Sequence, residues 1–88
     1  MKQPLFSLGL VVATPAAAKL LNDHKVNPAD LHQFGDWGLC CDEDAAVNEE
    51  SVRHHARVMS IYEVGDQRIW LLTETNRSSS TFILPFEY

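Results

Sequence analysis

Cysteine is scarce in this chain of 88 residues, because Cys40 and Cys41 are the only two and they are adjacent. A bridge between neighbouring cysteines closes almost no loop, so it would constrain the unfolded chain very little. The fold must therefore be held together by an apolar core. Two unpaired thiols are typical of a reducing compartment, and the sequence predicts a cytoplasmic protein.

Positive charge is also scarce, with 7 Lys and Arg against 12 Asp and Glu and a formal net charge of −5. Dedicated nucleic-acid-binding proteins usually carry a basic cluster, because contacts to phosphates supply most of their affinity. The charge balance argues against nucleic acid as the main partner and leaves a protein partner as the expectation. It gives neither the identity of that partner nor the oligomeric state.

Long apolar runs are missing too, so the sequence predicts no membrane-spanning helix. The longest candidate, residues 5–13, lies between Lys2 and three alanines at 16–18, which together imitate a signal peptide. The positive region is a single lysine, and cleavage would leave a small domain without disulfides. We interpret this segment as a buried strand that leads into a helix.

The apolar periodicity and the turn residues predict one α+β domain over residues 1–88. Thr14 and Pro15 have the form of a helix N-cap and first position. A second start signal of this kind, Asn27-Pro28, precedes a short helix in which Leu31 and Phe34 are expected to point inward. Trp70 and Leu72 are expected to be buried on one face of a three-stranded antiparallel meander, with Leu71 on the other. Strands are predicted at 5–13, 58–64, 68–74 and 80–84, and helices at 15–24, 28–34 and 42–55.

Several segments, in order along most of the chain, carry a likeness to a known group of proteins. They are Ala13-Thr14-Pro15, Asn27-Pro28-Ala29-Asp30-Leu31, His32 before Gly35-Asp36-Trp37-Gly38, Ile69-Trp70, Thr73 to Ser78, and Phe82 to Tyr88. In these segments the chain resembles a family of small uncharacterised bacterial proteins carried on plasmids and integrative mobile elements. They are described as plasmid-related or as a subunit of a type I restriction–modification system. The resemblance implies a mobile-element setting and brings no catalytic residues, and the chain is too short for a methyltransferase domain.

Cys40, Cys41, His54 and His55 are the residue types that bind zinc. Structural zinc sites usually space their cysteines two to four residues apart so that both side chains converge. Adjacent side chains diverge on a helix or a strand instead. We therefore expect no metal and no cofactor.

The second half of the chain carries a set of basic residues and a tyrosine that could act on RNA, with arginines holding phosphate and a histidine or tyrosine moving a proton. The alternative is that the arginines lie at sheet edges and the histidines compensate a helix dipole. The set consists of Arg53, His54, His55, Arg57, Arg68, Arg77 and Tyr88.

Gly35-Asp36-Trp37-Gly38 has two interpretations. It could be a recognition loop that presents Trp37 as an interface anchor. The interpretation we favour is a turn in which Asp36 bonds nearby amides and the indole closes the edge of the core.

Five acids between residues 41 and 50 could bind a basic partner or mimic nucleic acid to block a host enzyme, although a solvated helix start is the favoured interpretation. They are Asp42, Glu43, Asp44, Glu49 and Glu50.

The leading hypothesis is a non-enzymatic protein-interaction module of a mobile element, with Asp36, Trp37, Arg57 and Arg77 as candidate binding residues. The alternative is a small ribonuclease-like or nucleic-acid-binding domain that uses the Arg and His residues of the C-terminal half. No catalytic residue is assigned.

Overall fold

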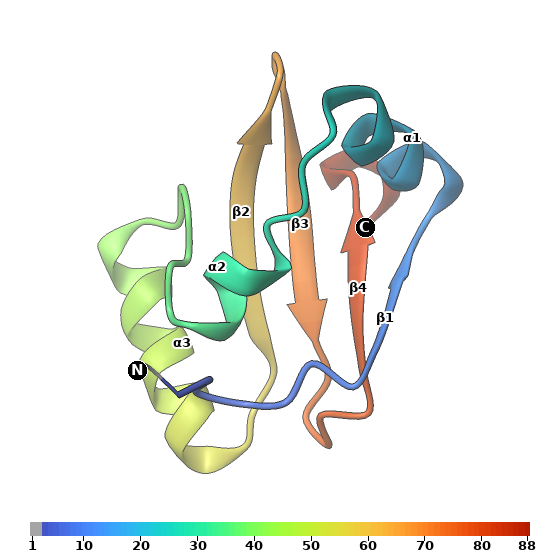
Figure 1. Ribbon diagram of the computed structural model, residues 1–88. Helices are drawn as coiled ribbons and strands as arrows, with labels where there is room; N and C mark the ends of the chain where they lie inside the picture. The colour runs from blue at the N-terminus through green and yellow to red at the C-terminus, as the bar shows by residue number, and fades with distance from the viewer. Residues whose placement is uncertain (1–2) are drawn as a thin grey trace.

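The computed structural model describes residues 3–88 and shows the mixed helix and strand content that the sequence predicts. Figure 1 shows how these elements are arranged around one sheet. In chain order they are β1 (Leu10–Ala13), α1 (Pro15–His24), α2 (Ala29–Gln33), α3 (Asp42–His54), β2 (Val58–Val64), β3 (Gln67–Thr73), β4 (Ser79–Ile83) and the 3₁₀ turn η1 (Pro85–Glu87). The predicted α+β class is confirmed.

The sheet has the order β1-β4-β3-β2, so β1 and β2 are its two edges (Figure 1). Strands β2, β3 and β4 form the predicted antiparallel meander. Strand β1 pairs in parallel with β4, which makes the sheet mixed rather than purely antiparallel. The first and last strands of the chain are therefore neighbours.

The first strand is shorter than predicted and is not buried. It begins at Leu10, and all four of its residues are exposed because it lies at the sheet edge. The chain turns at Gly9, whose φ of +64° and contact with the Ser78 carbonyl leave no room for a side chain. Residues before this turn cross the helical side of the sheet, where the N–H of Leu5 donates to the Gln33 carbonyl at 2.9 Å.

Helix α1 begins as its sequence predicts. The Thr14 hydroxyl accepts a hydrogen bond from the Ala17 N–H at 3.2 Å, and Pro15 occupies the first turn. Ala17, Leu20 and Leu21 are buried against the sheet. Local capping chemistry is therefore enough to start this helix, and its apolar stripe is enough to orient it.

Helix α2 is rotated relative to the prediction. Leu31 and Phe34 were expected inward, but both are exposed, while Ala29 and His32 are buried. The orientation follows from polar partners that the sheet offers to His32, because a buried imidazole is tolerated only when its nitrogens are hydrogen-bonded.

Helix α3 packs beside the β2 edge through a polar contact. The Asn48 side chain accepts from the Met59 N–H at 3.1 Å and donates to the Met59 carbonyl at 2.6 Å. These two bonds imitate a neighbouring strand, so they satisfy part of the β2 edge. The thin apolar stripe of α3 agrees with this role, since the helix covers an edge rather than a core.

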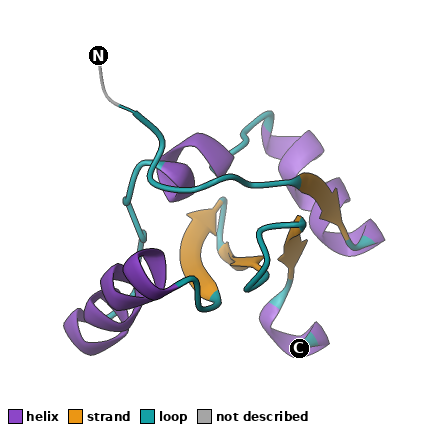
Figure 2. Cartoon of the chain, turned by 90° about the horizontal axis from the view of Figure 1, so that it is seen from below, coloured by secondary structure: helices purple, strands orange, loops and turns teal. Residues whose placement is uncertain are grey.

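The two faces of the sheet differ in what covers them. Helices α1 and α2 lie over one face, whereas α3 lies beside β2 and η1 lies on the other side (Figure 2). Leu72 is buried on the second face and Leu71 on the first, as predicted. Trp70 was expected to be buried but is half-buried, and the ring of Tyr88, which packs against it at a centroid distance of 5.1 Å, is itself exposed.

Within residues 3–88, no helix has the length and apolar character required to span a membrane.

Candidate functional site

The loop that contains Asp36 is fixed by hydrogen bonds at both ends. The Asp36 carboxylate accepts from the Gly38 N–H at 3.0 Å, which is the Asx-type turn that the sequence predicts. The Tyr62 hydroxyl donates to the Asp36 carbonyl at 2.6 Å. Burial raises the pKa of Tyr62, so this phenol remains a hydrogen-bond donor.

Trp37 is only 6% exposed, so it is not presented to solvent as an interface anchor. Its indole N–H donates to Glu49 at 3.3 Å, and its ring lies edge-on to His32 at a centroid distance of 5.9 Å. The favoured interpretation, in which the indole closes the edge of the core, is confirmed. Trp37 anchors the loop to the molecule instead of offering it to a partner.

The residues after Trp37 form a single parallel bridge with β2, between Gly38 and Ile61. The Ile61 N–H donates to the Trp37 carbonyl at 3.2 Å, and the Leu39 N–H donates to the Ile61 carbonyl at 2.6 Å. Gly38 has a φ of +69°, and a Cβ there would collide with the Ile61 carbonyl oxygen. The loop is therefore a rigid wall that requires glycine at this point, and it holds Leu39 outward.

A groove of about 460 Å³ lies between this wall and the segment that joins α1 to α2. Tyr62 and Val64 contribute to its lining from β2. Three aliphatic side chains around it, Val26, Leu31 and Leu39, are each between 45% and 48% exposed. Exposed aliphatic residues grouped around a concave surface are typical of a binding site.

The groove adjoins the part of the β2 edge that has free backbone groups. Along this edge, Met59 bonds to Asn48, and Ile61 bonds to Trp37 and Leu39. Backbone groups alternate in direction along a strand, so Glu63 is the next residue that points outward. Its N–H and C=O have no hydrogen-bond partner among the described residues, and Glu63 itself lines the groove.

Acidic side chains surround the same wall. Asp36, two residues before Gly38, and Glu63, in β2, are exposed, and the acidic start of α3 follows Leu39 closely along the chain. This first turn contains Asp42, Glu43 and Asp44. The groove is thus lined mainly by apolar residues, and the chain on either side of Gly38 and Leu39 carries acidic residues.

Arg57 lies away from the groove, with Tyr88 and Glu74. Its guanidinium donates to the Tyr88 hydroxyl at 3.1 Å and lies 3.7 Å from the Glu74 carboxylate. Arg68 lies opposite Glu63 in the register of β2 and β3, near the β2–β3 turn. Arg57 precedes β2 at the opposite end of the strand. The structure therefore does not bring Arg57 and Arg68 into one site.

Arg77 is a structural residue. Its guanidinium donates to the carbonyls of Ser51 at 3.0 Å, Ala56 at 2.7 Å and Glu74 at 3.0 Å, and it lies 5.4 Å from the centre of the Phe6 ring. These bonds tie the end of α3 to the β3–β4 turn. A guanidinium engaged in this way has few donors left for a ligand.

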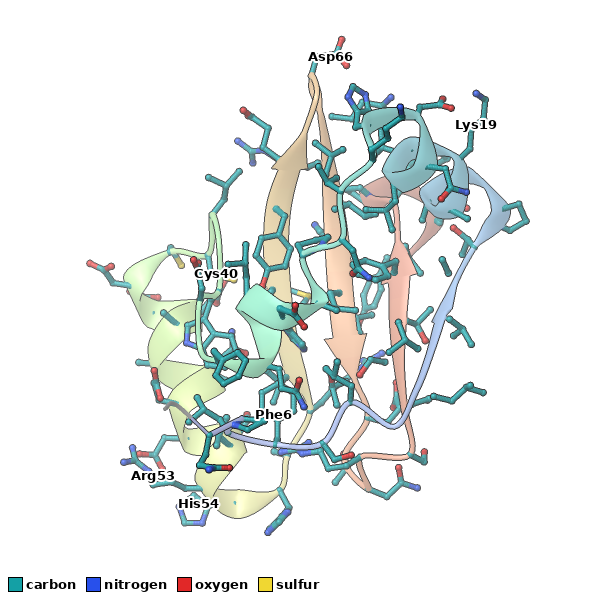
Figure 3. All side chains as sticks on the ribbon, in the orientation of Figure 1. Phe6, Lys19, Cys40, Arg53, His54 and Asp66 are labelled. Carbon is teal, nitrogen blue, oxygen red and sulfur yellow. The ribbon has the colours of Figure 1, made fainter. Side chains whose placement is uncertain are left out.

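The residues considered for a metal lie at the two ends of α3, as Figure 3 shows for Cys40 and His54. Cys40 and Cys41 precede the helix, His54 is its last residue, and His55 follows it. The Cys40 thiol donates to the Met59 carbonyl at 3.4 Å, and burial raises its pKa. A helix of 13 residues separates the two pairs by roughly 20 Å, which is far beyond the span of one metal site.

A buried polar network was missed by sequence reasoning. His32 is fully buried, with Nδ1 at 2.5 Å from the Ser60 hydroxyl and Nε2 at 2.8 Å from the Thr73 hydroxyl. Thr73 contacts Ser80 at 2.7 Å, and Ser80 donates to the Leu8 carbonyl at 2.7 Å. The only signal in the sequence is a small hydroxyl residue in each predicted strand of the meander, namely Ser60, Thr73 and Ser80.

The direction of this network follows from its last member. A carbonyl only accepts, so the single proton of Ser80 goes to Leu8, and Thr73 must donate to Ser80. Thr73 then accepts from His32, which places the imidazole proton on Nε2 and leaves Nδ1 to accept from Ser60. Burial, with a smaller effect of the Arg77 charge, lowers the pKa of His32 to about 4. The imidazole is neutral and inaccessible, so the network holds the fold and carries no chemistry.

No protein-family model, curated protein or solved structure matches this chain in the three comparisons made.

Proposed function

We propose that the chain is a non-enzymatic protein-interaction module that binds a short apolar segment of a partner protein in the groove beside β2. The proposal includes the mobile-element setting implied by the resemblance in the sequence, and the cytoplasm as the compartment. It assigns binding to Val26, Leu31 and Leu39, and a positioning role to Asp36 and Trp37.

The observation that carries the proposal is the outward placement of three aliphatic side chains around a preformed groove. Each of these side chains is already about half covered, so completing its burial contributes roughly 0.7–1.5 kcal/mol, half the value for a fully exposed side chain. The wall that carries Leu39 is held by Gly38 and Trp37, so binding requires little ordering of the protein.

The charge around the groove indicates the kind of segment that fits. Asp36, Glu63 and the acids at the start of α3 favour a partner segment with Lys or Arg beside its apolar residues. The free backbone groups of Glu63 can each bond to an extended chain, as in peptides that add a strand to a sheet edge. An extended apolar segment with a basic flank satisfies both features.

The ribonuclease alternative has weaker support. It requires several free arginines near a histidine, but Arg77 is bonded to three carbonyls and Arg57 is paired with Glu74. His54 lies 3.2 Å from Glu50, on the exposed surface of α3.

The test is selection of peptides from a displayed random library on the purified protein. We expect the selected peptides to be rich in aliphatic residues and Lys or Arg. Their binding, measured by fluorescence polarisation, should weaken at least about tenfold in Leu31→Asp and Leu39→Asp. Val47→Asp is the matched control, because Val47 is an exposed valine on α3 outside this groove, and it should bind normally.

Selection of no peptide that depends on Leu31 and Leu39 would contradict the proposal. Incubation with labelled RNA, using wild type and Arg57→Ala, separates the alternative. Cleavage by the wild type that is lost in Arg57→Ala would favour the ribonuclease.

A further inference from the structure

Strand β1 is an open edge with apolar side chains. It lies at one end of the sheet order β1-β4-β3-β2, and no described element pairs with its outer side (Figure 1). Leu10 is 69% exposed, Val11 42% and Val12 41%. Edge strands of this kind can pair with another chain unless something protects them.

The hydrogen bonds to β4 show which backbone groups of β1 are free. The N–H of Leu10 donates to the Ser78 carbonyl at 3.0 Å, and the N–H of Thr14 donates to the Phe82 carbonyl at 3.1 Å. In this parallel ladder, Leu10, Val12 and Thr14 therefore turn their backbone groups toward β4. Val11 and Ala13 turn theirs to the outer edge, which leaves two N–H and two C=O groups available.

Apart from its length of four residues, β1 lacks the usual protections of an edge strand. Proteins protect edge strands by keeping them short, or with charged side chains, proline or bulges. Residues 3–18 contain no charged residue, and the prolines in this stretch, Pro4 and Pro15, lie outside the strand. The opposite edge is treated differently, since Asn48, Trp37 and Leu39 cover the middle of β2.

We propose that β1 pairs antiparallel with β1 of a second copy of this chain, around a two-fold axis beside Val12. In this register Val11 lies opposite Ala13 of the second copy, and Ala13 lies opposite Val11 of the second copy. Each hydrogen-bonded pair of an antiparallel ladder exchanges two bonds, so four bonds form and every free group of the strand is used. The result is one continuous sheet of eight strands.

A second copy fits this edge better than an unrelated segment does. The pairing is self-complementary, because the same strand supplies donors and acceptors in the same order. Two chains with a net charge of −5 repel each other over most orientations, and this edge is an uncharged place where they can meet. Leu10 and Val12 from the two copies would also cover one another on the same face.

The interface is small, which sets its expected strength. Two strands of four residues bury less than the roughly 1,200 Å² of a stable complex. We therefore expect a dimer in exchange with monomer, with a dissociation constant of about 10⁻⁶ to 10⁻⁴ M.

Sedimentation equilibrium over about a hundredfold range of concentration tests the dimer. The wild type should shift from monomer to dimer, and Val12→Lys should remain a monomer, because it places two ammonium groups next to the axis. Val12 is exposed in the monomer, so this variant should keep its fold, as far-UV circular dichroism would show. Val47→Lys makes the same charge change on α3 and should dimerise like the wild type. A monomer at every concentration, or a dimer that survives Val12→Lys, would overturn the proposal.

Disulfide trapping tests the register. In a Cys40→Ser, Cys41→Ser background, Val12→Cys places two thiols in a non-hydrogen-bonded pair, where Cα atoms lie about 4.5 Å apart. It should cross-link faster than Leu10→Cys, whose counterpart across the axis is Thr14 of the second copy. Faster cross-linking of Leu10→Cys would show that the two-fold axis is misplaced. Neither result depends on the groove beside β2.

Discussion

Nδ1 of His32 accepts a hydrogen bond from the Ser60 hydroxyl at 2.5 Å, in a part of the core where both residues are completely buried. This bond joins α2 to β2, and the bond from Nε2 to Thr73 joins the same helix to β3. One neutral imidazole therefore fixes the position of a helix of only five residues. The consequences of this arrangement can be measured.

The protein should lose stability as the pH falls from 6.5 toward 4. The folded state holds the pKa of His32 near 4, against 6.5 when the chain is unfolded, so the unfolded state binds the extra proton in this interval. The contribution of His32 to the free energy of unfolding is fully present above pH 6.5, and about 3 kcal/mol of it is lost by pH 4. Urea unfolding across this range measures the change.

His32→Gln is the control for this pH dependence. It keeps a donor and an acceptor but has no proton to gain, so its stability at neutral pH should be lower and its slope between pH 6.5 and 4 smaller. An equal slope in both proteins would show that other groups cause the loss.

His32 should also be found as the Nε2–H tautomer. The hydrogen-bond directions fixed by the Leu8 carbonyl require it, and the lowered pKa keeps the ring neutral at about pH 5. Long-range ¹H–¹⁵N spectra of the imidazole distinguish the two tautomers directly. A proton on Nδ1 would mean that the chain of hydroxyl groups runs in the opposite direction.

Arg77→Ala should destabilise the fold by about 2–4 kcal/mol, because it removes three hydrogen bonds from a charged donor to backbone carbonyls. Arg57→Ala should cost less than about 1 kcal/mol, since Arg57 is nearly half exposed and makes a surface pair. Thermal or urea unfolding of the two variants gives the comparison. Similar losses would mean that Arg57 has a structural role that its contacts do not show.

Gly38→Ala should cost about 2–3 kcal/mol and weaken peptide binding in the groove. The added Cβ meets the Ile61 carbonyl oxygen, so the wall that carries Leu39 must move away from β2. Leu39→Ala is the matched variant, because it truncates an exposed side chain of the same loop without disturbing the backbone. It should leave the free energy of unfolding almost unchanged. If Gly38→Ala unfolds like the wild type, the loop is not held in the way described.

The parts of the fold that the sequence predicts are those with local causes. Thr14 and Pro15 start α1 wherever the helix packs, and the β2–β3 turn at Gly65 and Asp66 is encoded in neighbouring residues. The pairing of β1 with β4 depends on residues far apart in the chain, so no local pattern indicates it. Residues 5–13 form a nearly continuous apolar run, which is typical of a buried strand. The same pattern occurs here at an exposed edge, so the sequence does not distinguish the two positions.

The candidate site was predicted in part. The turn at Asp36 and the burial of Trp37 follow from residue chemistry, and both are observed. The groove is not encoded locally, because it is formed by α2, the loop at Leu39 and β2 together. Leu31 was expected inward because its spacing is helical, but the polar partners of His32 turn that face of α2 toward the sheet. A hydrogen-bond network thus overrode the apolar pattern.

The last prediction concerns Trp70 and the ring that packs on it. Tyr88 lies at a centroid distance of 5.1 Å from Trp70, is held by Arg57, and is itself mostly exposed. In a Trp37→Phe background, which leaves Trp70 as the only indole, Tyr88→Ala should shift the tryptophan emission to longer wavelength and increase quenching by acrylamide. Both effects follow because water then reaches a ring that the tyrosine partly covers. Phe86→Ala is the matched control, since Phe86 is an exposed aromatic residue that does not contact Trp70 through its ring, and it should leave the emission unchanged. An unchanged spectrum in Tyr88→Ala would mean that Tyr88 does not shield Trp70 in solution, and that this face of the sheet is more open than its contacts indicate.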